Sequence, residues 1–174
     1  MTTSMLSPDY LAGLEARSTE EVRKMRDDCV AFETGLSYLR RMAQGSLDIV
    51  SREFVRREVG GEAPDRATLI SELPGILADS PRPPGNGRLS QTLDPVEPDP
   101  GLVAELAAIV GDGVIADVLT MGDGELVELR DRLAGFEMRV SDRRRAFFER
   151  IDTLQAELTR RYRTGEATVD TLLA

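Results

Sequence analysis

Two long stretches of the chain carry apolar residues at alternating steps of three and four positions. Such steps gather apolar side chains into a narrow seam along one face of a helix, and that seam needs a partner to be buried. The pattern predicts an all-α protein built on two long helices, over 18–59 and 123–164. The seam positions are Val22, Met25, Cys29, Phe32, Leu36, Leu39, Ala43, Leu47, Val50 and Phe54, then Leu126, Leu129, Leu133, Phe136, Val140, Phe147, Ile151, Leu154 and Leu158.

Local signals bound these two helices. Ser18, with Glu21 three residues later, predicts a capping box at the start of the first helix. The pair Gly60-Gly61 ends it. Asp123 is the expected N-cap of the second helix. The long connection permits the two helices to pack antiparallel, and it permits other arrangements equally well.

The remaining segments carry weaker patterns. We expect a helical segment over 8–16, and an irregular, proline-rich linker over 60–100 with a possible short helix at 65–79. The segment 101–121 is apolar and alanine-rich, which predicts short helices packed near an end of the long pair. A chain of 174 residues fits one modest domain, so we expect a single helical domain over 1–174.

A row of polar residues follows the first seam, each polar residue one position after an apolar one. Glu33, Ser37, Arg40, Gln44 and Asp48 are separated by steps of 4, 3, 4 and 4. These steps place all five side chains on one helix face, in a stripe about four turns long.

The stripe recurs 104 residues later, with one change. Its second copy is Glu137, Ser141, Arg144, Phe148 and Asp152, so that Phe148 stands where the first copy has Gln. The flanks repeat at the same offset without gaps, so the two ends of the chain look like copies of one helical unit. Further identities are Glu53 with Glu157, Arg56-Arg57 with Arg160-Arg161, and Gly61-Glu62-Ala63 with Gly165-Glu166-Ala167.

Composition narrows the possible functions. The net charge of −9 makes general nucleic-acid binding unfavourable, because duplex affinity comes largely from phosphate neutralisation. The absence of His excludes Ser–His triads, Cys–His pairs and His-ligated metal sites, and we expect neither enzymatic activity nor a metal site. Cys29 is the single cysteine and is expected to be a small buried hydrophobe. With no membrane-spanning stretch and no signal sequence, we expect a cytoplasmic protein without membrane partners.

The stripes combine the donors and acceptors that suit a guanine nucleotide. Arginine forks onto guanine O6 and N7 or onto a phosphate, and a carboxylate accepts from the guanine N1–H and N2–H2 groups. Ser and Gln bond phosphate, ribose or base edges. The plainer interpretation is a set of flanking charges that pair across the helices. Phe148 either broadens the apolar seam or stacks on a base.

The five-residue pattern resembles the signature of the RsiG family, cyclic-di-GMP-dependent anti-sigma factors of sporulating actinobacteria. The resemblance covers about 19–58 and 123–162. It implies that the two helices pair as an antiparallel coiled coil that binds cyclic-di-GMP. It also implies ligand-dependent capture of a WhiG-type sporulation sigma factor, away from RNA polymerase. The implied ligand-binding residues are Glu33, Ser37, Arg40, Gln44, Asp48, Glu137, Ser141, Arg144 and Asp152.

A second hypothesis remains beside the resemblance. The same helices would also suit a structural coiled-coil interaction module that binds no nucleotide. The two hypotheses differ in what the stripes do, because only the first gives them a ligand. We expect no direct DNA binding under either hypothesis.

Overall fold

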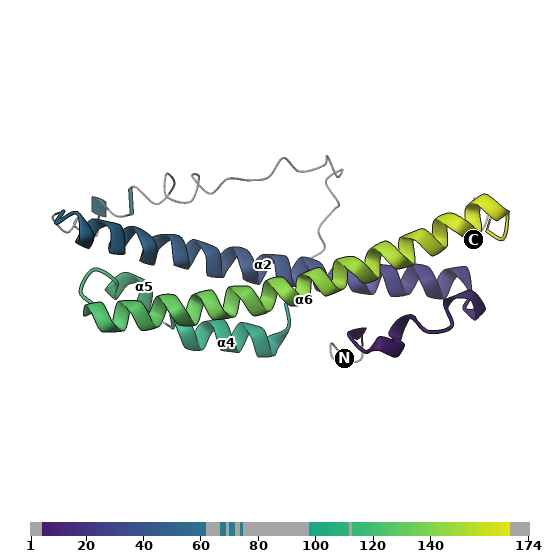
Figure 1. The fold of residues 1–174 in the computed structure, drawn as a ribbon, viewed down its shortest axis with the longest axis horizontal. Helices are drawn as coiled ribbons and strands as arrows, with labels where there is room; N and C mark the ends of the chain where they lie inside the picture. The colour runs from purple at the N-terminus through teal and green to yellow at the C-terminus, as the bar shows by residue number, and fades with distance from the viewer. Residues whose placement is uncertain are drawn as a thin grey trace.

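Two long helices dominate the structure, a computed structural model that describes residues 5–61, 67–68, 70–71, 74, 98–111 and 113–167. They are α2, Thr19–Glu58, and α6, Asp123–Thr164, and they lie side by side (Figure 1). The described residues contain no strand. The prediction of a helical chain with two long packed helices is therefore confirmed for this part of the chain.

The two long helices run in opposite directions. Near one end of the pair, Arg57 Nη1 donates to Asp123 Oδ1 at 2.6 Å, which joins the end of α2 to the start of α6. At the other end, Arg23 donates to the Tyr162 hydroxyl, which joins the start of α2 to the end of α6. The path of the chain in Figure 1 shows the same arrangement.

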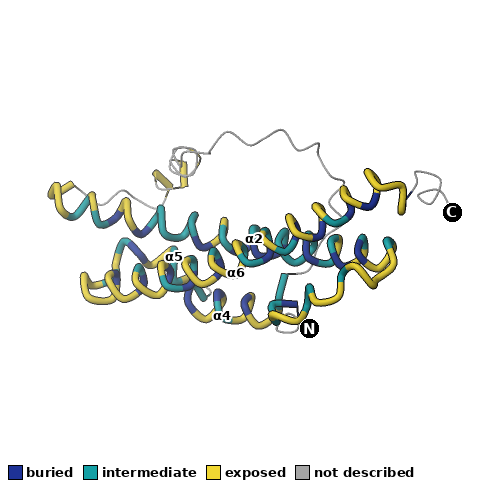
Figure 2. The backbone as a smooth tube through the Cα atoms, turned by 45° about the vertical axis from the view of Figure 1, so that its right-hand side comes forward, coloured by how far each residue is buried: buried dark blue, intermediate teal, exposed yellow. Residues whose placement is uncertain are grey.

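The predicted seams meet and form the core. All the seam positions are buried or packed against the buried cluster, and Figure 2 shows the buried positions along the facing sides of the pair. The rings of Phe32 and Phe147 stack across the seam, with centroids 5.7 Å apart. Burying one large apolar side chain stabilises the fold by about 1.5–3 kcal/mol. The seam has one gap, because Arg143 occupies the position equivalent to Leu39 and is exposed.

The long helices begin as their sequences indicate, with one correction. Ser18 Oγ accepts from Glu21 N at 3.1 Å and Glu21 Oε2 accepts from Ser18 N at 2.7 Å, so the capping box is confirmed. The N-cap of α6 is Gly122, and Asp123 is the first helical residue. Gly122 N donates to Glu125 Oε2 at 2.9 Å, which supplies half of the same motif without a capping side chain.

Short elements precede each long helix. The turns η1, Pro8–Leu11, and η2, Leu14–Ala16, come before α2. The helices α4, Pro100–Val110, and α5, Val114–Asp117, come before α6. The expected helix over 8–16 is thus two 3₁₀ turns, because Gly13 between them has a φ of 68°, which no helix accommodates.

These short elements pack on the long helices on the side of the seam away from the polar stripes. Gly35 of α2 precedes a seam residue, and a Cβ on it would lie 3.2 Å from Pro98 Cα. On α6, Arg132 Nη2 donates to the Ala108 carbonyl at 3.0 Å, and Arg150 Nε donates to the Met5 carbonyl at 2.8 Å. Each of these α6 arginines stands one position before a seam residue, whereas the stripe residues stand one position after. One flank of the pair is therefore covered.

A similar arginine clamp closes each end of the helix pair. At the first end, Glu53 is almost fully buried and accepts from Arg56 and Arg57. Arg57 Nη2 then reaches the carbonyls of Val118 and Met121 at 3.2 and 2.9 Å, in the segment that leads into α6.

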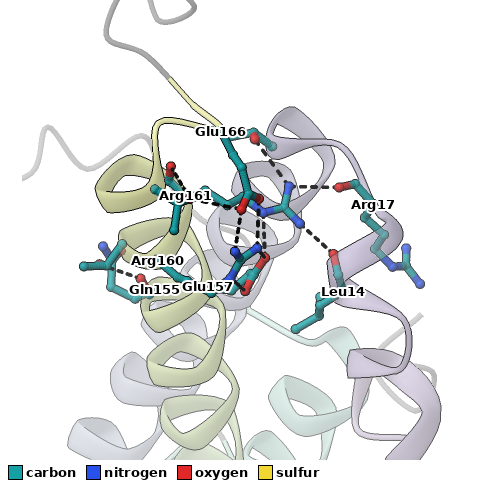
Figure 3. A network of polar contacts seen from close by, with 10 residues as sticks. Leu14, Arg17, Gln155, Glu157, Arg160, Arg161 and Glu166 are labelled. Atoms are coloured by element: carbon teal, nitrogen blue, oxygen red, sulfur yellow. Dashed lines mark hydrogen bonds and ion pairs between the residues drawn. The ribbon is translucent and has the colours of Figure 1, made fainter.

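The second clamp repeats the first at an offset of 104 residues (Figure 3). Glu157 accepts from Arg160 Nε at 2.9 Å and from Arg161 Nε at 2.6 Å. Arg161 then donates to the carbonyls of Leu14 and Arg17 at 2.6 and 2.8 Å, in the segment that leads into α2. The repeated flanks of the sequence thus fasten each helix end to the start of the other helix.

Part of the predicted organisation lies outside the described residues. The expected linker over 60–100 and its short helix at 65–79 are described only at scattered positions. The segment 101–121 forms the helices α4 and α5, and α4 packs against both long helices. The single domain over 1–174 stays a prediction.

The Glu157 clamp predicts a pH-dependent stability. The hydrogen bonds from Arg160 and then Arg161 lower the pKa of the Glu157 carboxyl from its ordinary 4.5 to about 2. A lowered pKa means that the folded state favours the ionised carboxylate, so the stabilisation is complete above about pH 4.5 and is lost as the pH falls toward 2. We expect the Tm difference between wild type and Glu157→Gln to be largest at pH 7 and to vanish near pH 2. Thermal unfolding followed by circular dichroism measures it.

Glu149→Gln is the matched control, since it neutralises an exposed carboxylate of the same helix. The same pH profile for both variants would show that the clamp contributes nothing to stability.

Candidate functional site

The two polar stripes face each other near the middle of the helix pair and form two half-sites. The first, named the Glu137 half-site, consists of Arg40 and Gln44 from α2 with Glu137 and Ser141 from α6. Glu137 Oε1 accepts from Ser141 Oγ at 3.0 Å, from Gln44 Nε2 at 3.1 Å and from Arg40 Nη1 at 3.3 Å. One carboxylate oxygen therefore holds three donors from both helices.

The second, named the Glu33 half-site, consists of Glu33 and Ser37 from α2 with Arg144 and Phe148 from α6. Glu33 Oε1 accepts from Ser37 Oγ at 2.7 Å and from Arg144 Nε at 2.8 Å. The guanidinium carbon of Arg144 lies 4.9 Å from the centroid of the Phe148 ring. Phe148 therefore touches the signature arginine of its own stripe.

The half-sites are related by an approximate two-fold axis between the helices. In each one, a Glu accepts from the Ser four residues later on its own helix and from the Arg of the opposite helix. This follows from packing two copies of one stripe in opposite directions. The seven residues from Glu33 to Arg40 rise about 10 Å along α2, which sets the spacing of the two half-sites.

The signature aspartates lie farther out. Asp48 is one turn beyond Gln44 and is half-buried with polar contacts of its own, whereas Asp152 is one turn beyond Phe148 and is exposed. Because the helices run in opposite directions, the two aspartates lie toward opposite ends of the pair. Eight of the ten stripe positions thus gather in the central cluster of two half-sites, and the aspartates flank it.

The cluster is partly open to solvent. The exposed fractions of the charged side chains are 12% for Glu33, 22% for Glu137, 26% for Arg144 and 29% for Arg40. Ion pairs on an open surface contribute about 0–1 kcal/mol, and these pairs are more covered, so breaking them without a replacement partner would cost more. A ligand that offers the same number of hydrogen bonds is therefore able to replace them.

The cross-helix ion pairs agree with both interpretations of the stripes. Pairing between Arg40 and Glu137, and between Arg144 and Glu33, is what ordinary flanking charges do. Less ordinary is that Ser37 and Ser141 bond the same glutamate oxygens. The result is a polar network on one flank of the pair rather than isolated ion pairs.

Sequence reasoning missed the roles of other residues. The arginines of the two clamps were visible as repeats, but their partners include backbone carbonyls, which have no sequence signature. The arginine tethers Arg132 and Arg150 also bond carbonyls. Within the described residues, no group of three or more acidic or cysteine side chains is placed to hold a metal ion. No described helix is long and apolar enough to cross a membrane.

Comparison with known proteins gives a family. No curated protein matches the chain. A family model described as RsiG-like matches residues 8–77 and 113–174, which is most of the chain. The two matched ranges contain the two stripes, the two clamps, the turns η1 and η2 before α2 and the helix α5 before α6, whereas α4 lies between the ranges. The chain therefore belongs to the RsiG-like family.

Proposed function

We propose that this protein is an anti-sigma factor that binds cyclic-di-GMP at the central cluster and then holds a WhiG-type sigma factor away from RNA polymerase. Membership of the RsiG-like family supports the anti-sigma role. The observation that supports the proposed ligand is the pair of facing half-sites, each with one Arg paired with one Glu. We expect the protein to act in the cytoplasm and to catalyse no reaction.

The scaffold of this site is an antiparallel coiled coil formed by α2 and α6. Its support is the alternation of three and four between buried positions on both helices, together with the opposite chain directions. A coiled coil packs each seam residue between residues of the other helix, so such a scaffold would be rigid. Rigidity suits a ligand site, since side chains held in place lose little entropy on binding.

Nucleotide binding is an exchange of partners within each half-site. A phosphate or the guanine O6 and N7 pair would replace the glutamate as the partner of arginine. The guanine N1–H and N2–H2 groups would replace the arginine as the donors to that glutamate. Ser37 and Ser141 remain available for phosphate or ribose oxygens. The exchange leaves no charged group without a partner, which is the condition for binding without a large desolvation cost.

Cyclic-di-GMP suits this exchange because it carries two guanines and two phosphates. The site offers two arginines, two glutamates and two serines in a two-fold arrangement. Arg41 and Arg145, exposed beside the signature arginines, add positive charge near the phosphates. Asp48 and Asp152 are proposed to contact outlying guanine edges.

Ligand dependence follows from the position of the stripes. They lie beside the seam on the flank that the described short elements do not tether, so a bound nucleotide would lie at the surface. A partner protein would then contact both the helices and the nucleotide. The ligand would favour the bound state because it forms part of the interface.

The alternative is a structural coiled-coil module without nucleotide. The observation in its favour is that every charged member of the central cluster is paired with another side chain of the cluster. Calorimetric titration with cyclic-di-GMP, with GTP as the control nucleotide, separates the two functions. Binding of neither nucleotide would favour the alternative.

Removing either signature arginine should weaken nucleotide binding. Arg40→Ala and Arg144→Ala each delete the only cation of a half-site. Charge-assisted hydrogen bonds of about 1.5–3 kcal/mol correspond to a loss of roughly ten- to hundredfold in affinity. Calorimetric titration with cyclic-di-GMP measures the loss, and circular dichroism checks that helicity is retained.

Arg139→Ala is the matched control for both variants. It also removes one arginine and one ion pair between elements, with Glu105 of α4, but on the covered flank. We expect its affinity for cyclic-di-GMP to be unchanged. Equal losses of cyclic-di-GMP affinity in all three variants would mean that binding depends only on the net charge of the protein. The central cluster would then not be the binding site.

The aspartates should contribute to base discrimination. We expect Asp48→Asn and Asp152→Asn to reduce the preference for cyclic-di-GMP over cyclic-di-AMP, because a carboxylate accepts from guanine N–H groups that adenine lacks. Competition titrations with the two cyclic dinucleotides measure this ratio. If the wild type binds cyclic-di-AMP as well as cyclic-di-GMP, the proposed base contact is wrong.

Sigma-factor capture should require the nucleotide. We expect a WhiG-type sigma factor to bind tightly only with cyclic-di-GMP present, since each tenfold of affinity needs only about 1.4 kcal/mol of added contact. A pull-down with and without nucleotide, repeated with Arg40→Ala, tests this. Equal capture without nucleotide would remove the ligand-bridged mechanism, and no capture in either condition would remove the anti-sigma assignment for that partner.

A further inference from the structure

We propose that Phe148 makes the two half-sites unequal, so that the Glu33 half-site binds the guanine nucleotide more tightly than the Glu137 half-site. This inference rests on the proposed function, because it concerns the same cluster. Its starting point is the one departure from two-fold symmetry among the stripe residues. The position occupied by Gln44 in one stripe is occupied by Phe148 in the other.

The first consequence concerns the carboxylates. Glu137 Oε1 holds three donors, and one of them is the Gln44 amide. Within the described residues Glu33 Oε1 holds two, because Phe148 has no hydrogen-bond donor. A guanine edge brings two N–H donors, and a carboxylate has about four lone-pair positions for them. Fewer existing hydrogen bonds to Glu33 therefore have to break when guanine binds.

The second consequence concerns the arginines. Arg144 is held twice, by its Nε bond to Glu33 at 2.8 Å and by the Phe148 ring at 4.9 Å. Arg40 is held by one longer bond, from Nη1 to Glu137 at 3.3 Å. A guanidinium that is already held against a ring loses less conformational entropy when a ligand binds. A cation–π contact at a partly exposed site corresponds to about two- to fivefold in an equilibrium constant.

The third consequence concerns the nitrogens that remain for the ligand. Arg144 donates to Glu33 from Nε, and neither of its terminal nitrogens is bonded within the described part of the chain. It is therefore ready for the end-on fork onto a phosphate or onto guanine O6 and N7. Arg40 donates to Glu137 from Nη1 and keeps Nε and Nη2, which form the side-on fork and have no bond within the described residues, so this comparison favours neither half-site.

Gln44 offers one advantage that Phe148 lacks, which is a hydrogen bond to the ligand. That advantage is small, because Gln44 Nε2 already donates to Glu137 at 3.1 Å. Exchanging one neutral hydrogen bond for another gains little free energy. The smaller number of donors on Glu33 and the contact of Arg144 with the Phe148 ring both favour the Glu33 half-site.

The test compares the two alanine variants directly. Calorimetric titration with cyclic-di-GMP should show that Arg144→Ala loses about two- to fivefold more affinity than Arg40→Ala. When Phe148→Gln is also present, the two alanine variants should lose equal affinity, because both half-sites then have a glutamine. Gln44→Phe should make the losses equal as well, by giving both half-sites a phenylalanine. Equal losses in the wild-type background, or a difference that persists with Phe148→Gln, would overturn the proposal.

A ligand-free measurement separates this proposal from the proposed function. In ¹⁵N NMR of the free chain, the Arg144 Nε–H should exchange with water more slowly than the Arg40 Nε–H, and Phe148→Gln should remove the difference. Equal exchange in the wild type would overturn the structural basis of the asymmetry. Wild-type protein that binds no cyclic-di-GMP would remove the proposed function and the inference together, whereas binding with equal alanine losses would remove the inference alone.

Discussion

Burial of one apolar seam against another, in opposite directions and in one register, is the constraint on which the structure depends. The cross-helix bonds of the site exist only in that register. Sliding α6 by one turn would move Glu137 about 5 Å from Arg40, beyond hydrogen-bonding reach. Fully buried rings such as Phe136 and Phe147 resist such a slip, because it would open voids in a close-packed core. The clamps resist it at both ends, so the position of each half-site is fixed by residues outside it.

Much of this arrangement was predictable because it is periodic. The alternation of three and four identified the seam, and the 104-residue offset identified the second stripe before any contact was known. Three features were harder to predict, because each depends on the backbone of a neighbouring segment rather than on a side-chain pattern. They are the break in the helix at Gly13, the N-cap at Gly122 and the hydrogen bond from Arg150 to a carbonyl. The role of Phe148 was also open in the sequence, since only geometry shows that its ring carries the Arg144 guanidinium.

The central cluster shows how the helix pair pairs the charges of its two stripes. If each stripe stood alone, its arginine and its glutamate would lack the partner that the other helix provides. Packing two copies in opposite directions lets every arginine meet a glutamate from the other copy. The network is neutral within each half-site, and 12–29% of each charged side chain stays exposed, so the paired charges remain in contact with solvent. The two-fold arrangement thus serves stability and accessibility together.

The clamps have an evolutionary consequence. Arg57 and Arg161 reach carbonyl oxygens in the segments before the helices, and every residue type supplies a carbonyl. The clamp itself therefore places no demand on the side chains at those positions, although Val118 is buried in the core and Leu14 and Met121 pack against it. The arginines themselves are constrained, because lysine has no planar fork with which to join a glutamate and two carbonyls at once. Ancestral copies of this helical unit would be most readily traced by the spacing of Glu and Arg pairs at helix ends.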